Sequence, residues 1–252
     1  MVNIKPISKK AYTTKQSLSD FMPKLSARII ISGPSGTGKG VLVASLLLNP
    51  QLYRDCFAKI YYFSGSATLD HSLEPLKDYA HSQLGMSQEE DPCLRDGWSE
   101  AEVSKILANQ RKVVLAAKRR GTELPAICIV CDDLADNKKA MHGSMLQSLF
   151  TRGRHSNVTI ILMTQRYRLL DVTTRVNANA LFIFRMRNAK DLEAIVEENS
   201  ALADKDTLLR VYDQATRAKY GFLYVDLMQS DPNLMFFKNL TARLLPGARG
   251  AF

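Results

Sequence analysis

Short apolar runs recur along this chain, and stretches with a single apolar face separate them. Runs rich in Ile, Val, Leu and Phe that are bounded by turn residues are typical of strands buried on both faces of a sheet. By this criterion the sequence predicts strands at about 29–31, 58–63, 126–131, 158–163, 180–184 and 220–225.

The stretches between these runs have the spacing of helices. They lie at about 39–48, 73–82, 99–120, 138–150, 191–198 and 204–216, and we expect a loop at 89–96. Ser99 and Glu102 form a capping box at the start of the longest helix. Strands that alternate with helices predict an α/β fold in which a mostly parallel sheet carries helices on both faces.

The first strand leads into a glycine-rich turn, which an apolar helix follows. The turn reads Gly33, Pro34, Ser35, Gly36, Thr37, Gly38, Lys39, Gly40, Val41. A strand, then Gly-x-x-x-x-Gly-Lys, then a helix is the context that a phosphate-binding loop requires, although a flexible Gly/Ser turn is the alternative. Backbone N–H groups and the helix N-terminus would face the phosphates of ATP, and Lys39 would neutralise them.

The residue after Lys39 departs from this motif. A Ser or Thr normally stands there and ligates Mg²⁺ through its hydroxyl, whereas this chain has Gly40 and then Val41. Magnesium would therefore depend on water and on a carboxylate elsewhere in the chain. The departure bears on hydrolysis more than on nucleotide binding.

Two carboxylates, Asp132 and Asp133, follow the apolar strand at 126–131. This is the pattern of a Walker B element, and ligands of open α/β sheets bind at the carboxyl ends of the strands. We expect Asp132 to hold Mg²⁺ through water and Asp133 to orient or deprotonate the attacking water. Capping of the next helix is the alternative role for one of the two.

Gln165 follows the strand at 158–163. Ring-forming ATPases place an additional strand between the strand of the phosphate loop and the Walker B strand, and we expect 58–63 to continue that layout. Gln165 would then be a sensor that contacts the γ-phosphate or the attacking water. A Gln that binds only solvent at a strand end is the alternative.

The charge balance indicates a polyanionic partner. The chain has 34 Lys and Arg against 25 Asp and Glu, a formal net charge of +9, and its cations gather at 5–28, 111–120 and 152–168. Such clusters are the electrostatic footprint of nucleic-acid binding, although a solvated basic surface is the alternative.

Cysteines and apolar runs exclude other classes. Cys128 and Cys131 lie three positions apart on a predicted strand, so they face opposite sides of the sheet and cannot easily share a metal. No apolar run approaches the ~20 residues of a membrane span, and the first ten residues lack the apolar core of a secretion signal. We expect a cytosolic type of compartment and no membrane span.

The segment 151–165, TRGRHSNVTIILMTQ, resembles the signature of the FtsK/HerA superfamily of DNA-pumping ATPases. Its Gly-Arg-His, apolar strand and Thr-Gln are most similar to genome-packaging ATPases of double-stranded DNA viruses, among them poxvirus-type, giant-virus and virophage proteins. The segment 175–185, RVNANALFIFR, also matches, as a turn with Arg and Asn that enters a strand. The resemblance covers roughly residues 27–226.

This resemblance implies a RecA-like, ASCE-type P-loop NTPase that assembles as a homo-oligomeric ring. Such a motor hydrolyses ATP between subunits and moves double-stranded DNA into a preformed capsid, in the virion or the host cytoplasm. A capsid vertex or membrane-associated portal proteins are further implied partners. Arg154 matches the arginine that the superfamily supplies in trans to a neighbour's γ-phosphate, and Arg152 is the second candidate. Contact with a DNA phosphate or capping of a helix is the alternative role for either arginine. His155 is expected to pack or form hydrogen bonds and not to bind a metal.

The resulting division has a basic N-terminal arm at 1–26, a P-loop ATPase domain at 27–226 and a C-terminal tail at 227–252. Two other interpretations stay open. A cellular or plasmid FtsK/HerA-like translocase fits less well, because the chain is compact and lacks a membrane segment. A nucleotide kinase or nucleotide-binding module would explain the phosphate loop but needs neither the Asp-Asp nor the Thr-Gln strand.

Overall fold

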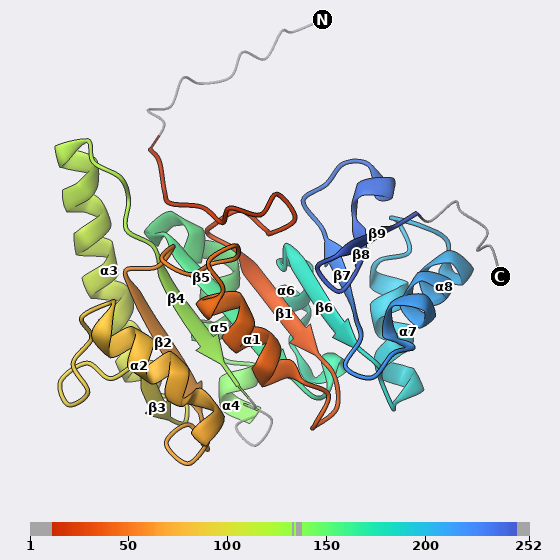
Figure 1. Ribbon diagram of the computed structural model, residues 1–252, viewed down its shortest axis with the longest axis horizontal. Helices are drawn as coiled ribbons and strands as arrows, with labels where there is room; N and C mark the ends of the chain where they lie inside the picture. Colours follow the sequence, from red (N-terminus) through yellow and green to blue (C-terminus); the bar gives the residue numbers. More distant parts are fainter. Residues whose placement is uncertain (1–11, 133, 135–137, 246–252) are drawn as a thin grey trace, which may run out of the picture.

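One mixed sheet forms the centre of the protein in the computed structural model, which describes residues 12–132, 134 and 138–245 (Figure 1). The described strands follow the order β3-β2-β4-β5-β1-β6-β7-β8-β9 across the sheet. Their bounds are β1 (Arg28–Ser32), β2 (Lys59–Ser64), β3 (Leu94–Asp96), β4 (Ile127–Cys131), β5 (Val158–Thr164), β6 (Ala180–Phe184), β7 (Phe222–Asp226), β8 (Phe236–Lys238) and β9 (Ala242–Leu244).

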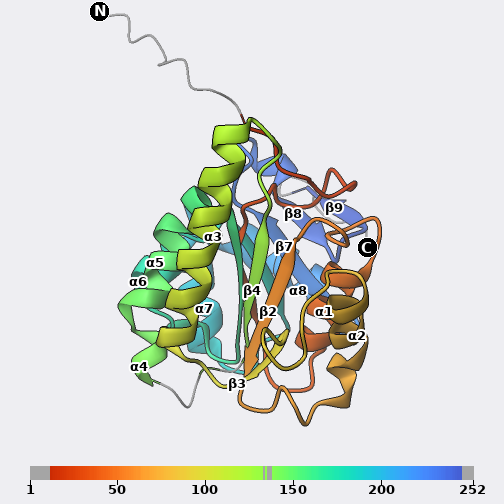
Figure 2. The same ribbon diagram turned by 90° about the vertical axis from the view of Figure 1, so that its left-hand side faces the viewer.

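Helices cover both faces of this sheet, as predicted. Figure 2 shows α1 and α2 on one face and α3 and α5 on the opposite face. The α-helices are α1 (Lys39–Leu48), α2 (Glu74–Ser82), α3 (Glu100–Arg120), α4 (Lys138–Met141), α5 (Ser144–Arg152), α6 (Val172–Val176), α7 (Ala189–Glu198) and α8 (Lys205–Thr216). Ser99 caps α3 by accepting a hydrogen bond from the backbone N–H of Glu102.

The parallel part of the sheet runs from β3 to β6, and β4 and β5 are buried along their whole length. Continuous burial explains why these strands are apolar runs without alternation. The strand between β1 and β4 is β5, whereas β2 lies beyond β4. Ser32 pairs with Thr164, and Cys131 pairs with Leu162. The segments that follow β1, β4 and β5 therefore leave the sheet at the same edge.

The far side of the sheet differs from the prediction. β7 pairs with β6 antiparallel, and β8 and β9 continue the sheet beyond it, where we expected a tail from residue 227. Phe236 and Phe237 of β8 are buried, and the Phe237 ring stacks on Tyr224 with 5.2 Å between centroids. Burial of these aromatic rings is a physical reason for the segment to join the sheet.

Two local predictions also need correction. The segment expected to be a loop at 89–96 contains β3, which pairs with the end of β2. The helix expected at 138–150 is two helices, α4 and α5, because Gly143 adopts an extended backbone conformation just before α5. Cys128 and Cys131 are both free and fully buried, so each packs in the core as a small apolar side chain.

The described part of the N-terminal arm packs on the body of the protein. Leu124 N donates to Thr13 O at 2.9 Å, and the Tyr53 hydroxyl donates to Pro23 O. Within the described ranges, no helix is both long and apolar enough to cross a membrane.

Candidate functional site

The turn after β1 has the backbone that a phosphate-binding loop needs. Gly36 and Gly38 have φ angles of 75° and 98°, a left-handed region that glycine adopts without strain. Gly33 is required for a different reason, because a Cβ built on it would lie only 2.6 Å from the Phe184 Cβ. Gly38 directly precedes α1, so the turn opens onto the N-terminus of that helix.

Lys39 is folded across this turn. Its Nζ donates to the carbonyl oxygens of Gly33 at 2.8 Å and Pro34 at 3.0 Å, and the Thr37 hydroxyl donates to Pro34 O at 2.8 Å. The ammonium group therefore lies where the turn closes on itself. An incoming polyphosphate would compete with backbone carbonyls for this cation.

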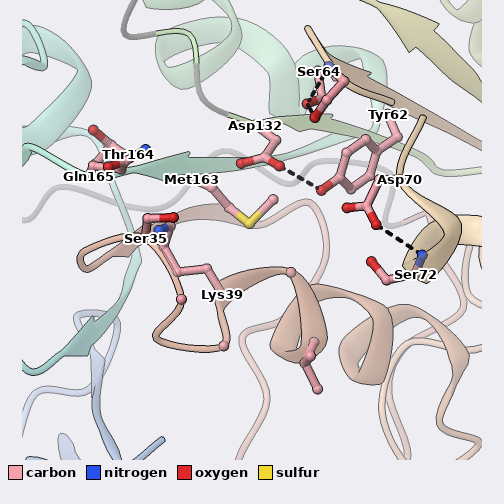
Figure 3. A pocket seen from close by; sticks show the side chains of 15 residues that line it. Ser35, Lys39, Tyr62, Ser64, Asp70, Ser72, Asp132, Met163, Thr164 and Gln165 are labelled. Carbon is pink, nitrogen blue, oxygen red and sulfur yellow. Dashed lines mark hydrogen bonds between the residues drawn. The ribbon is translucent and has the colours of Figure 1, made fainter. Parts of the chain in front are cut away.

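A cleft of about 290 Å³ extends from the turn along the carboxyl edge of the sheet (Figure 3). It lies between α1, the ends of β2, β4 and β5, and the short 3-10 helix η1 (His71–Leu73). The lining includes Ser35, Gly36, Gly38, Lys39, Gly40, Val41, Tyr62, Ser64, Asp70, Asp132, Met163, Thr164 and Gln165. Most of the predicted nucleotide residues thus meet in one cavity, and Gly33, Pro34 and Thr37 belong to the same turn.

Asp132 reaches the cleft from the end of β4 and contacts a tyrosine of the neighbouring strand. The Tyr62 hydroxyl donates to Asp132 Oδ2 at 3.0 Å (Figure 3). Burial, and then the charge of Asp132, raise the pKa of Tyr62 well above its ordinary value. The hydroxyl therefore stays protonated, and its hydrogen bond helps to hold the orientation of the Asp132 carboxylate. Asp133 lies outside the described residues.

The cleft offers two carboxylates, Asp132 and Asp70, to a magnesium ion that arrives with a triphosphate. Asp70, a second carboxylate in the cleft, accepts a hydrogen bond from the backbone N–H of Ser72 at 2.9 Å. Gly40 offers no ligand, and a Cβ built on it would meet nothing within 4 Å. The described residues contain no cluster of three or more His, Cys, Asp or Glu side chains that could hold a metal. Mg²⁺ usually needs only one or two carboxylates when phosphates and water complete its shell.

Gln165 lines the same cleft from the tip of β5. This tip is joined to the phosphate loop, because Gly33 N donates to Thr164 O at 3.1 Å. The Thr164 hydroxyl also accepts a hydrogen bond from Arg166 N at 3.1 Å, which fixes the turn after the strand. Lys39, Asp132 and Gln165 are therefore brought together from three separate elements.

Tyr62, Ser64 and Asp70 line the cleft without having been predicted from the sequence. Tyr62 and Ser64 are two positions apart at the carboxyl end of β2, and such residues share one face of a strand. That spacing was the available signal for both. Asp70 caps η1 from a segment without periodicity, and nothing in the sequence marks it.

Arg154 lies at the opposite end of β5, in the 3-10 helix η3 (Gly153–Ser156). Arg152, Arg154 and His155 are all exposed. The seven residues of β5 separate this turn from Gln165, roughly 20 Å at the rise of a strand. Arg154 is therefore not brought to the cleft of its own chain.

The surroundings of Arg154 are basic. Burial, and then the charge of Arg154, lower the pKa of the half-buried Arg28. Arg28 Nε is buried without a hydrogen-bond partner among the described residues. On the neighbouring face, Arg111 of α3 and Arg152 of α5 line one groove together with His155. This edge of the molecule thus gathers cations that the expected clusters at 5–28, 111–120 and 152–168 contribute separately.

The sequence matches the model of a known protein family. The model of the family described as Poxvirus A32 protein matches residues 15–225. Protein 075L of Invertebrate iridescent virus 6 is 26% identical over 206 residues, which are 81% of this chain and 72% of that protein. Protein 015R of Frog virus 3 is 24% identical over 206 residues, which are 82% of this chain and 58% of that protein.

Comparison with solved structures concerns the fold. B204, described as the DNA-packaging ATPase from Sulfolobus turreted icosahedral virus, has a TM-score of 0.53 at 16% identity, covering 81% of this chain and 94% of B204. The pCW3 conjugation coupling protein TcpA also has a TM-score of 0.53 at 16% identity, covering 82% of this chain and 58% of TcpA. These likenesses confirm the predicted P-loop NTPase fold with its mostly parallel sheet.

Proposed function

The chain belongs to the Poxvirus A32 protein family, and from that premise we propose that it is an ATPase motor that moves double-stranded viral DNA into a preformed capsid. The observation that carries the proposal is the cleft in which Lys39, Asp132 and Gln165 converge beside the glycine-rich turn. Support also comes from B204 of a second virus, Sulfolobus turreted icosahedral virus 2, which is described as a genome-packaging NTPase and has been solved in complex with ATP-γS.

In this proposal the turn from Gly33 to Val41 binds the phosphates of ATP. Lys39 exchanges its two backbone carbonyl partners for the β- and γ-phosphate oxygens, while the N–H groups of the turn and the N-terminus of α1 face the same anion. Asp132 holds magnesium through water, and the bound ion would neutralise charge on the phosphates. Tyr62 keeps the Asp132 carboxylate directed at the cleft.

Two residues are assigned to the attacking water. Gln165 lies at the tip of β5 beside the phosphate loop and orients that water or contacts the γ-phosphate. Asp133, the next residue after Asp132, is proposed as the base that accepts its proton. Both roles follow from position in the motif together with the parallel strand order.

Arg154 is proposed to act on the nucleotide of a neighbouring copy in a ring. It is exposed and lies at the other end of β5, so it cannot complete the site of its own chain. Arg28 stands beside it as a second cation, and an anion from outside would relieve their mutual repulsion. A γ-phosphate at a subunit interface is such an anion.

DNA contacts are assigned to backbone phosphates. The net charge of +9 and the groove lined by Arg111 and Arg152 favour a polyanion, which would be bound through its phosphates. A motor that moves along DNA must accept every sequence. Capsid components remain the proposed anchoring partners, and the virion or the host cytoplasm the proposed location.

The deciding experiment measures ATP hydrolysis with and without double-stranded DNA, next to native mass spectrometry of assembly. We expect DNA to stimulate hydrolysis, the stimulation to fade as salt rises, and a ring-sized mass to appear with nucleotide. A Lys39→Ala variant is the inactive control. Hydrolysis that ignores DNA, or transfer of phosphate from ATP to AMP or GMP, would contradict the proposal in favour of a kinase.

A further inference from the structure

Tyr220 has a backbone conformation that its side chain makes unfavourable. It lies in the turn between α8 and β7, with a φ of 63°, and its side chain is 59% exposed. A bulky residue in the left-handed region is uncommon, and such residues gather at sites that clamp ligands. An exposed aromatic ring in this position gains nothing from burial in the core.

The turn itself imposes this conformation. Gly221 N donates to Ala218 O at 2.9 Å, and a Cβ built on Gly221 would lie 2.6 Å from Ala215 O. Phe222 N then donates to the Asn239 side chain at 3.0 Å, which joins the start of β7 to the segment after β8. These contacts place Tyr220 between the end of α8 and the sheet.

The Tyr220 ring lies against the phosphate loop. A Cβ built on Gly38 would be 3.5 Å from Tyr220 Cδ1 and 4.0 Å from its Cβ, so the tyrosine borders the residue that directly precedes α1. The Lys219 ammonium is 4.9 Å from the centroid of the ring and orders it by a cation–π contact. An aromatic face is thus positioned at the rim of the loop by a segment about 180 residues away in the sequence.

The direction in which the triphosphate must lie determines on which side of the phosphate loop the nucleoside is bound. Asp132 and Gln165 follow β4 and β5, which lie on one side of β1, whereas β6 and β7 lie on the other. Hydrolysis requires the terminal phosphate to face Asp132 and Gln165. The remaining phosphates follow the loop away from them, so the nucleoside leaves on the side of β6 and β7, where Tyr220 stands.

We propose that Tyr220 is the platform on which the base of the bound nucleotide stacks, and that it makes the site prefer a nucleotide over a bare polyphosphate. The inference rests on the proposed nucleotide site and adds a base subsite to it. Stacking of a base on an aromatic side chain is sequence-tolerant and strong enough to change affinity about tenfold or more. The ring is required for this role, and the hydroxyl is not.

The test compares ATP-γS with inorganic tripolyphosphate, a probe that has no base, by isothermal titration calorimetry. The main variant is Tyr220→Asn, because Asn tolerates a positive φ and removes the ring without adding strain. We expect it to weaken ATP-γS binding about tenfold or more and to leave tripolyphosphate binding unchanged. Tyr220→Phe should bind both probes like the wild type.

Each other outcome is decisive. Unchanged ATP-γS affinity in Tyr220→Asn would overturn the stacking role, and so would an equal loss for both probes, which would indicate a distorted loop. Loss of assembly by native mass with intact ATP-γS affinity would make Tyr220 a subunit contact. A wild type that binds tripolyphosphate as tightly as ATP-γS sinks this inference alone, whereas a wild type that binds neither sinks the proposed function as well.

Discussion

At the carboxyl end of β5, Thr164 and Gln165 are held against the phosphate loop, whereas at its amino end Arg152 and Arg154 extend into solvent. The two ends belong to one buried strand, so their separation is fixed by the sheet. Polar groups at the carboxyl end already have partners within the chain. At the amino end, burial and then the charge of Arg154 lower the pKa of Arg28.

The proposed chemistry is therefore divided between the two ends of this strand. Binding and orientation of the triphosphate can be prepared inside one subunit, because its parts leave the same edge of the sheet. A group that must act on the developing charge of a γ-phosphate cannot be supplied by Arg154 of the same chain. We therefore expect a substitution at the carboxyl edge to inactivate the nucleotide site of the subunit that carries it. A substitution at the amino edge should instead inactivate the site of the neighbouring subunit.

The largest effect is expected at the carboxyl edge from Lys39→Ala. Removing the only side-chain cation of the turn should abolish tight ATP binding and reduce hydrolysis to background. Calorimetry and a phosphate-release assay would measure both quantities. Lys59→Ala is the matched control, since Lys59 pairs with Asp91 at the amino end of β2, away from the cleft. Normal nucleotide affinity in Lys39→Ala would remove the turn from the site.

Arg154→Ala should keep ATP binding and assembly but lose most DNA-stimulated hydrolysis. Arginines supplied in trans are worth about 10³–10⁵ in rate in P-loop systems. Mixing Arg154→Ala with Lys39→Ala subunits should restore activity where an intact site faces an intact arginine. Arg154→Lys tests the need for the guanidinium, and Arg152→Ala tests the second candidate. Mixed rings that stay inactive would assign Arg154 to DNA or to structure.

Tyr62→Phe should have a smaller effect on turnover. Loss of one hydrogen bond to the Asp132 carboxylate corresponds to about a 10- to 150-fold lower rate, together with a higher magnesium requirement. Tyr61→Phe is a matched control, because Tyr61 on the same strand donates to Asp91 at 3.3 Å and does not line the cleft. Equal magnesium requirements in the two variants would show that Tyr62 does not position Asp132.

Gly40→Thr should change activity least, by no more than about a few-fold. The added side chain meets open space, and Gly40 is not among the glycines with positive φ. Its hydroxyl should therefore strengthen magnesium dependence and preserve or raise turnover, which a magnesium titration of hydrolysis would show. A collapse of activity would mean that bound nucleotide approaches the backbone too closely for any side chain there.

The parallel half of the sheet could be predicted because its signals are local. Gly33, Gly36 and Gly38 predict the turn, and continuous apolar runs predict the buried strands around it. β8 and β9 could not be predicted, because each has only three residues and gains its stability from partners across the sheet. The contact between Tyr62 and Asp132 joins residues 70 positions apart, and no single-sequence pattern links them.

Two arginines in the segments that carry the family resemblance differ in their surroundings. Arg175 lies in one of the segments that carry the family resemblance, and its guanidinium pairs with Glu198 at 2.8 Å while donating to Leu170 O at 2.9 Å. These contacts give it a structural task in joining α6 to α7. Arg154 lies in the other segment and has an exposed side chain. Sequence similarity selects both, and only the fold separates them.

Asn157 links the turn of Arg154 to two other segments. Its side chain donates to Thr14 Oγ1 at 3.1 Å and Leu124 O at 2.8 Å and accepts a hydrogen bond from the Ser26 hydroxyl at 2.8 Å. These hydrogen bonds join the arm, the approach to β4 and the arginine turn to one another. A substitution of Asn157 would therefore disturb all three segments at once, and the turn that carries Arg154 is one of them.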